Sequence, residues 1–111
     1  MSTNSPEEVV VGIEIQIELA ERKVKRFSSS AVTVSMVPMV DGRLKEIRDM
    51  QDQIDLAFLG FKRTNTGHES IAGLEKKIDT LGDQIAKNEK AVMDSVAKLC
   101  SGGVGCKLIS Q

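Results

Sequence analysis

The sequence has 111 residues, of which 41 % are apolar and only 3 % aromatic, with neither Trp nor Tyr. Its 15 basic and 16 acidic residues leave a net charge of −1, so composition gives no general attraction to nucleic acid or to an anionic membrane surface. Aliphatic side chains must fill the core, which suits thin helical packing better than a deep globular interior. We therefore expect residues 1–111 to form a single small helical domain with no nucleic-acid partner.

No apolar run approaches the roughly 20 residues that a membrane-spanning helix needs. Residues 1–8 are polar and acidic, and they lack the basic and apolar regions of a signal peptide. We expect a cytoplasmic protein that does not insert into membranes, and secretion without a cleaved signal remains open.

The first predicted helix begins at the sequence Ser5-Pro6-Glu7-Glu8, after a flexible terminus at residues 1–5. Ser5 can cap the helix, Pro6 suits its first position, and Glu8 completes a capping box. An apolar stripe then follows at helical spacing, and it comprises Val10, Ile13, Ile17, Ala20, Val24 and Phe27. Serines at 28–30 mark a candidate break, but the pattern continues and predicts a helix over residues 6–36.

The same segment carries a competing strand signal. In residues 9–19 apolar side chains alternate with other residues, and many of them are β-branched. Residues 33–37 also favour strand, so an α+β fold with an N-terminal β-hairpin is the alternative to an all-α fold.

A second helix is predicted over residues 42–62, after Pro38 and a cap-like Asp41-Gly42. Leu56 and Leu59 fall off its main stripe, so its C-terminal half is apolar on more than one face. Such a helix end usually contacts more than one neighbour. We take four residues here as candidates for partner binding: Leu56, Phe58, Leu59 and Phe61.

Residues 62–67 form the predicted linker, and Thr66 with Glu69 has the spacing of another capping box. The third helix is predicted from His68 to Cys100, antiparallel to the second because the connection is short. A glycine-rich segment follows it, so residues 101–111 are expected to be a flexible terminus.

A heptad pattern runs along this third helix, the signature of a helix that meets another along a narrow line. We call it the heptad seam, and its residues are Ile71, Leu74, Ile78, Leu81, Ile85, Asn88, Val92, Ser95 and Leu99. Gly82 and the few charged flanking residues argue against an autonomous coiled coil. The chain is expected to form an all-α three-helix bundle, or a long antiparallel helical hairpin, with a coiled-coil-like seam that also binds a partner. Asn88 either faces solvent or pairs with a partner residue and fixes register.

No pattern of residues indicates catalysis, a cofactor or a metal. Cys100 and Cys106 match neither the C-x-x-C redox motif nor a zinc site, and they could be free thiols or form a disulfide. His68, the only histidine, falls in the first turn of the predicted third helix and is expected at the surface. We expect no enzyme activity and no small-molecule substrate.

The sequence Phe58-Leu59-Gly60, between two helical stretches, resembles the Trp-x-Gly turn of small helical-hairpin type VII secretion proteins. The Trp is absent, and a chain without Tyr cannot carry the family's C-terminal Tyr-x-x-x-acid signal. The sequence favours a noncatalytic interaction or assembly protein: a structural protein acting as a small complex subunit, an adaptor or a homo-oligomer. The resemblance implies the alternative, a secretion-linked chaperone or a secreted helical-hairpin partner protein.

Overall fold

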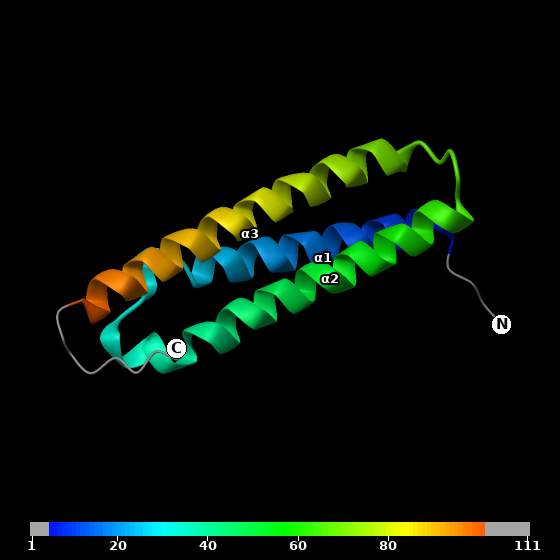
Figure 1. Cartoon of the computed structure of the whole chain (residues 1–111). Helices are drawn as coiled ribbons and strands as arrows, with labels where there is room; N and C mark the ends of the chain where they lie inside the picture. The colour runs from blue at the N-terminus through cyan, green and yellow to red at the C-terminus, as the bar shows by residue number, and fades with distance from the viewer. Residues whose placement is uncertain (1–4, 102–111) are drawn as a thin grey trace.

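Three long helices lie side by side in the computed structural model, which describes residues 5–101 (Figure 1). They are α1 (Pro6–Arg26), α2 (Val40–Thr64) and α3 (Ser70–Cys100), and two short 3-10 helices, η1 (Ser29–Ala31) and η2 (Val34–Met39), join α1 to α2. Helix α2 runs antiparallel to both of the others, so α1 and α3 point the same way. The all-α prediction is confirmed, and the bundle is elongated, with extents of 57 × 27 × 22 Å.

The predicted start of the first helix is confirmed. The backbone nitrogen of Glu8 donates to the Ser5 hydroxyl oxygen at 3.3 Å, and the Ser5 nitrogen donates to a Glu8 carboxylate oxygen at 3.1 Å. The β-hairpin alternative is wrong, because residues 9–19 are helical and no strand occurs within residues 5–101. The capping box and the tertiary contacts of α1 outweigh the β-propensity of its branched side chains.

The predicted extent of the first helix is wrong, because α1 ends at Arg26 rather than at residue 36. Val32 and Val37 are both buried in the connection that follows. A continuous helix would carry this segment past the end of the bundle, whereas the 3-10 helices fold it back across that end. Helix α2 then starts at Val40, two residues before the predicted start, and has no side-chain cap.

The connection between α2 and α3 also differs from the prediction. Helix α2 continues to Thr64 and α3 begins at Ser70, so the linker is residues 65–69 rather than 62–67. Gly67 has φ of +84°, the left-handed conformation that glycine adopts without strain. This residue lets the chain reverse direction between the two helices.

The capping box predicted at the start of α3 is wrong. The Thr66 hydroxyl donates back to the carbonyl oxygen of Lys62 at 3.3 Å, and Glu69 makes no capping bond. Instead the Nδ1 atom of His68 accepts a hydrogen bond from the backbone nitrogen of Ser70 at 3.1 Å. The His68 side chain thus provides the acceptor for the Ser70 amide in the first turn of α3.

His68 is not a surface residue as expected, because only 18 % of its side chain is exposed. Its ring meets the ring of Phe61 edge-on, with 5.3 Å between the ring centres. Its Nε2 atom lies 3.7 Å from a carboxylate oxygen of Glu7. The histidine therefore packs the start of α1 against the turn between α2 and α3.

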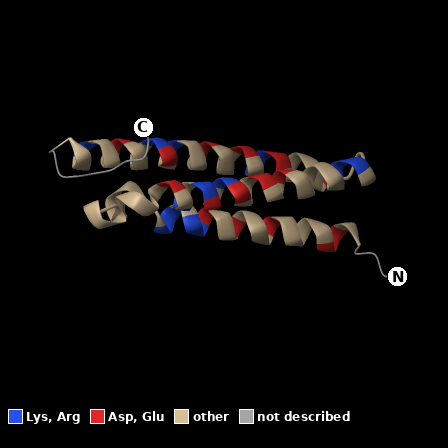
Figure 2. Cartoon of the chain, turned by 60° about the horizontal axis from the view of Figure 1, so that its bottom comes forward, with Lys and Arg blue, Asp and Glu red and all other residues tan. Residues whose placement is uncertain are grey.

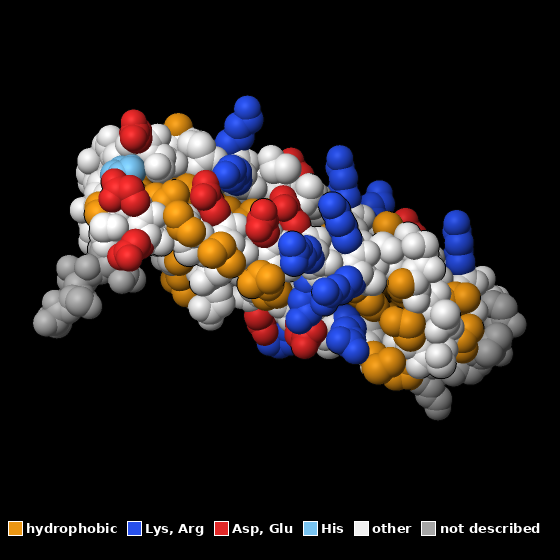
Figure 3. Space-filling view, turned by 180° about the vertical axis from the view of Figure 1, so that it is seen from behind, with side chains coloured by type: hydrophobic (Ala, Val, Ile, Leu, Met, Phe, Trp, Pro, Cys, Tyr) orange, Lys and Arg blue, Asp and Glu red, His pale blue; other side chains and the backbone are white. Residues whose placement is uncertain are grey.

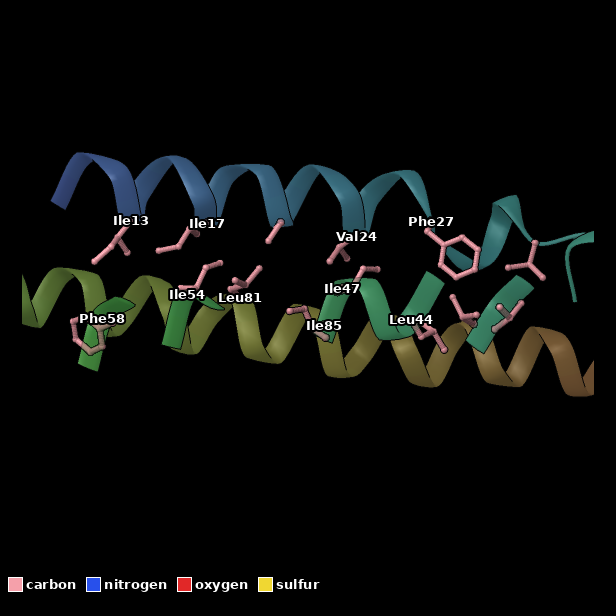
Figure 4. Packing of buried hydrophobic residues seen from close by; sticks show 14 of the residues in the cluster. Ile13, Ile17, Val24, Phe27, Leu44, Ile47, Ile54, Phe58, Leu81 and Ile85 are labelled. Atoms are coloured by element: carbon pink, nitrogen blue, oxygen red, sulfur yellow. The ribbon is translucent and has the colours of Figure 1, made fainter. Parts of the chain in front are cut away.

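All three helices contribute aliphatic side chains to one continuous core (Figure 4). At its centre Ile47, Ile54 and Leu81 are at most 1 % exposed. Ion pairs between exposed side chains join each pair of helices along the edges: Lys77–Glu14, Lys23–Glu46, Arg48–Glu89 and Lys62–Glu75. Exposed pairs of this kind contribute at most about 1 kcal/mol each, so the apolar core is the main source of stability.

Candidate interaction surface

The heptad seam of α3 lies mostly inside the bundle. Leu74, Leu81, Ile85 and Val92 are buried, while Ile71, Ile78 and Leu99 are half-buried and pack against the core. The seam therefore meets α1 and α2 of the same chain, and a partner could reach its buried residues only by opening the bundle. The heptad assignment also omits Val96, which is 1 % exposed.

Asn88 of the heptad seam is half-buried rather than facing solvent, and its pairing with a partner residue stays a prediction. Its side-chain nitrogen donates a hydrogen bond of 3.0 Å to the backbone carbonyl oxygen of Phe27, the residue that caps the C-terminal end of α1. The last carbonyl groups of a helix have no partner within the helix, and this amide supplies one. Asn88 thus joins α3 to the end of α1 within the chain.

The apolar group at the C-terminal half of α2 divides into two. Phe58 and Phe61 are 8 % and 3 % exposed and belong to the core, whereas Leu56 and Leu59 are 65 % and 44 % exposed. Only the two leucines are accessible to a partner without unfolding. The sequence Phe58-Leu59-Gly60 lies within α2 and not at a turn, so the hairpin turn implied by the resemblance is absent there.

A second apolar surface lies on α1, where the sequence pattern was interpreted as a competing strand signal. Val11, Ile15 and Leu19 are 52 %, 51 % and 50 % exposed, and their four-residue spacing aligns them along the solvent side of the helix. We call these three residues the outer stripe. Ile13 and Ile17, on the opposite side of α1, are buried. The alternation in the sequence therefore arises because α1 is apolar on two sides.

The outer stripe forms a ridge between two shallow grooves. Val11 and Ile15 line a groove between α1 and α3 together with Lys76. Leu19 lines a groove between α1 and α2 together with Met50. A helix that packs against the ridge would thus also reach side chains of both neighbouring helices.

Charges divide α1 into an acidic and a basic half (Figure 2). Figure 3 looks onto α1 and shows apolar side chains between an acidic and a basic region. The acidic residues are Glu7, Glu8, Glu14, Glu18 and Glu21, and the basic residues, all of which follow Glu21, are Arg22, Lys23, Lys25 and Arg26. Lys23 pairs with Glu46, whereas Arg22, Lys25 and Arg26 have no acidic partner within residues 5–101. Three cations close to the outer stripe are therefore available to another molecule.

A second cluster of like charges lies where α2 meets α3. Partial burial is the main cause that raises the pKa of the Asp55 carboxyl, and the negative charges of Asp52 and Asp79 raise it further. Within residues 5–101, no three His, Cys, Asp or Glu side chains are arranged to hold a metal ion. Cys100 is half-buried at the end of α3, and Cys106 lies outside the described residues, as does any disulfide between the two.

None of the described helices is long and apolar enough to cross a membrane. Comparison with known proteins finds no matching family model, no matching curated protein and no matching solved structure.

Proposed function

We propose that this protein is a noncatalytic assembly protein, a small helical subunit or adaptor that binds another protein chain through an exposed apolar helix face. The observation that carries this proposal is the outer stripe of α1, whose three aliphatic side chains are each about half exposed. A helix that is apolar on both its inner and its outer side is usually covered on both.

Two further features support protein binding at this surface. Covering an aliphatic side chain stabilises a complex by about 25 cal/mol for each Å² of apolar surface removed from water, and an apolar patch rimmed by charges is typical of protein contact sites. Leu56 and Leu59 add exposed apolar surface on α2. The heptad seam contributes indirectly, because it holds α1 in place through the core.

Affinity isolation of the tagged chain from its native source, followed by mass spectrometry, tests the proposal. We compare the wild-type chain with Ile15→Glu, which changes one exposed side chain, and check both folds by circular dichroism. We expect that one or more proteins, or an untagged copy of the chain itself, co-isolate with the wild type and do not co-isolate with the variant. If both chains retain the same proteins and the wild type stays monomeric in light scattering, the outer stripe is not a binding surface. Recovery of the intact chain from culture medium would instead favour the secretion-linked alternative.

A further inference from the structure

We infer that the outer stripe of α1 binds a second copy of this chain, with the two α1 helices antiparallel about a twofold axis at Ile15. This inference rests on the proposed function and names the partner for the same surface. It follows from the symmetry of the outer stripe, from the charges at its two ends, and from the cations that have no partner within the described residues.

The apolar residues of the stripe suit a twofold axis. Val11 and Leu19 lie four residues before and after Ile15, and all three are exposed to nearly the same extent. An antiparallel pair centred on Ile15 therefore places Ile15 against its equivalent and Val11 against Leu19 of the second copy. Both subunits then present the same surface, as a closed twofold dimer requires. Contact along the whole stripe requires the two helices to cross at a shallow angle, about 20°, which is one of the common classes of helix packing.

The charges of α1 select the antiparallel orientation. Glu8 and Arg22 lie seven residues before and after Ile15, on the same side of the helix as the stripe. The antiparallel pair brings Glu8 of each copy to Arg22 of the other, twice over by symmetry. A parallel pair would bring Glu8 to Glu8 and Arg22 to Arg22, and like charges in contact oppose association.

The charged groups at both ends of the stripe are available for pairing with another chain, which supports this arrangement. Arg22 has no acidic partner within residues 5–101, and the Glu8 carboxylate makes only its capping hydrogen bond there, to the Ser5 nitrogen. Glu8 and Arg22 are separated by 14 residues, about 21 Å along one helix, so they cannot pair within a chain. The interface is one helix wide, so we expect a dimer with a dissociation constant that is roughly micromolar or weaker.

Sedimentation velocity of the full chain over a range of concentrations tests self-association. We expect a reversible monomer–dimer equilibrium, and we expect Ile15→Glu to weaken it at least about tenfold, because two carboxylates would face each other at the axis. Ile15→Ser is a milder second variant. The matched control is Met93→Glu, at an apolar position of α3 that is 40 % exposed and lines the groove between α2 and α3, away from the outer stripe, and it should leave the equilibrium unchanged. A wild-type chain that stays monomeric at several hundred micromolar, or a dimer insensitive to both Ile15 variants, would overturn the inference.

The orientation has a separate test. Glu8→Gln keeps the capping box, because Gln also serves at that position, but removes the charge. In the antiparallel dimer, Glu8→Gln and Arg22→Gln should each weaken association by about two- to fivefold, and the double variant should be little worse than either. If Glu8→Gln strengthens the dimer, the helices are parallel and the inference is wrong. If the wild-type chain is monomeric but binds another protein that the Ile15→Glu variant does not bind, self-association is refuted while the proposed function stands.

Discussion

The side-chain nitrogen of Asn88 donates a hydrogen bond of 3.0 Å to the backbone carbonyl oxygen of Phe27, across 61 positions of the sequence. This bond accounts for a polar residue in an otherwise largely apolar seam. It gives a partner to a carbonyl group at the end of α1, and it fixes the position of α1 along α3.

We expect Asn88→Ala to lower the free energy of unfolding by about 1 kcal/mol, since the Phe27 carbonyl loses its donor in a half-buried position. Asn88→Asp should cost more, because a carboxylate would face that carbonyl oxygen and the negative end of the α1 dipole. Urea denaturation followed by circular dichroism measures both. Equal stabilities of the wild type and Asn88→Asp would show that the bond contributes nothing.

Leu81 tests whether the seam is structural. It is fully buried, so Leu81→Ala should lower the free energy of unfolding by about 2–5 kcal/mol through lost burial and the cavity left behind. The matched control is Leu56→Ala, where the leucine is 65 % exposed and the change should be within about 0.5 kcal/mol. Similar losses in the two variants would contradict the placement of α3 in the core.

Two glycines should respond to alanine in opposite directions. Gly60 is helical, and a β-carbon added there would meet nothing within 4 Å, so Gly60→Ala should raise the free energy of unfolding by about 0.5–1 kcal/mol. Gly67 has a positive φ, so Gly67→Ala should lower it by about 1 kcal/mol or more. Thermal unfolding of the two variants provides the comparison. A loss of stability in Gly60→Ala would mean that Gly60 lies at a turn after all, as the resemblance implied.

Asp55 should make stability depend on pH. Its folded-state pKa is raised, chiefly by burial, so the native state binds this proton more tightly than the unfolded chain does. The contribution of Asp55 to the free energy of unfolding is therefore fully present below the ordinary Asp pKa of about 3.9. It is lost as pH rises through the raised pKa of the folded state. Asp55→Asn removes the charge and should be more stable than the wild type at neutral pH, by up to about 0.5 kcal/mol, with no advantage at pH 3.

Asp49→Asn is the control for this charge effect. Asp49 accepts a hydrogen bond from the Lys45 ammonium at 3.2 Å, so its substitution should reduce stability slightly at neutral pH. Denaturation midpoints of the three chains at pH 3 and pH 7 give the comparison. An advantage of Asp55→Asn that persists unchanged at pH 3 would show that its cause is not ionisation.

Local sequence determined the start of the first helix, because Ser5 and Glu8 satisfy each other's backbone groups within one turn. It also determined which side of α3 is apolar, since a periodic pattern needs no information from elsewhere in the chain. The 3-10 helices after α1 could not be predicted in the same way. They exist because Val32 and Val37 are buried where the chain crosses the end of the bundle.

Tertiary structure alone decided which apolar residues remain exposed on the surface of the bundle. Sequence periodicity marks a residue as apolar, but it does not say whether another helix of the same chain covers it. Leu81 and Ile15 are equally aliphatic. Helices α1 and α2 cover Leu81, whereas neither α2 nor α3 covers Ile15, which is half exposed. The heptad seam, the strongest pattern in the sequence, is therefore used within the bundle, and the outer stripe becomes the candidate surface because three helices cannot cover both sides of α1.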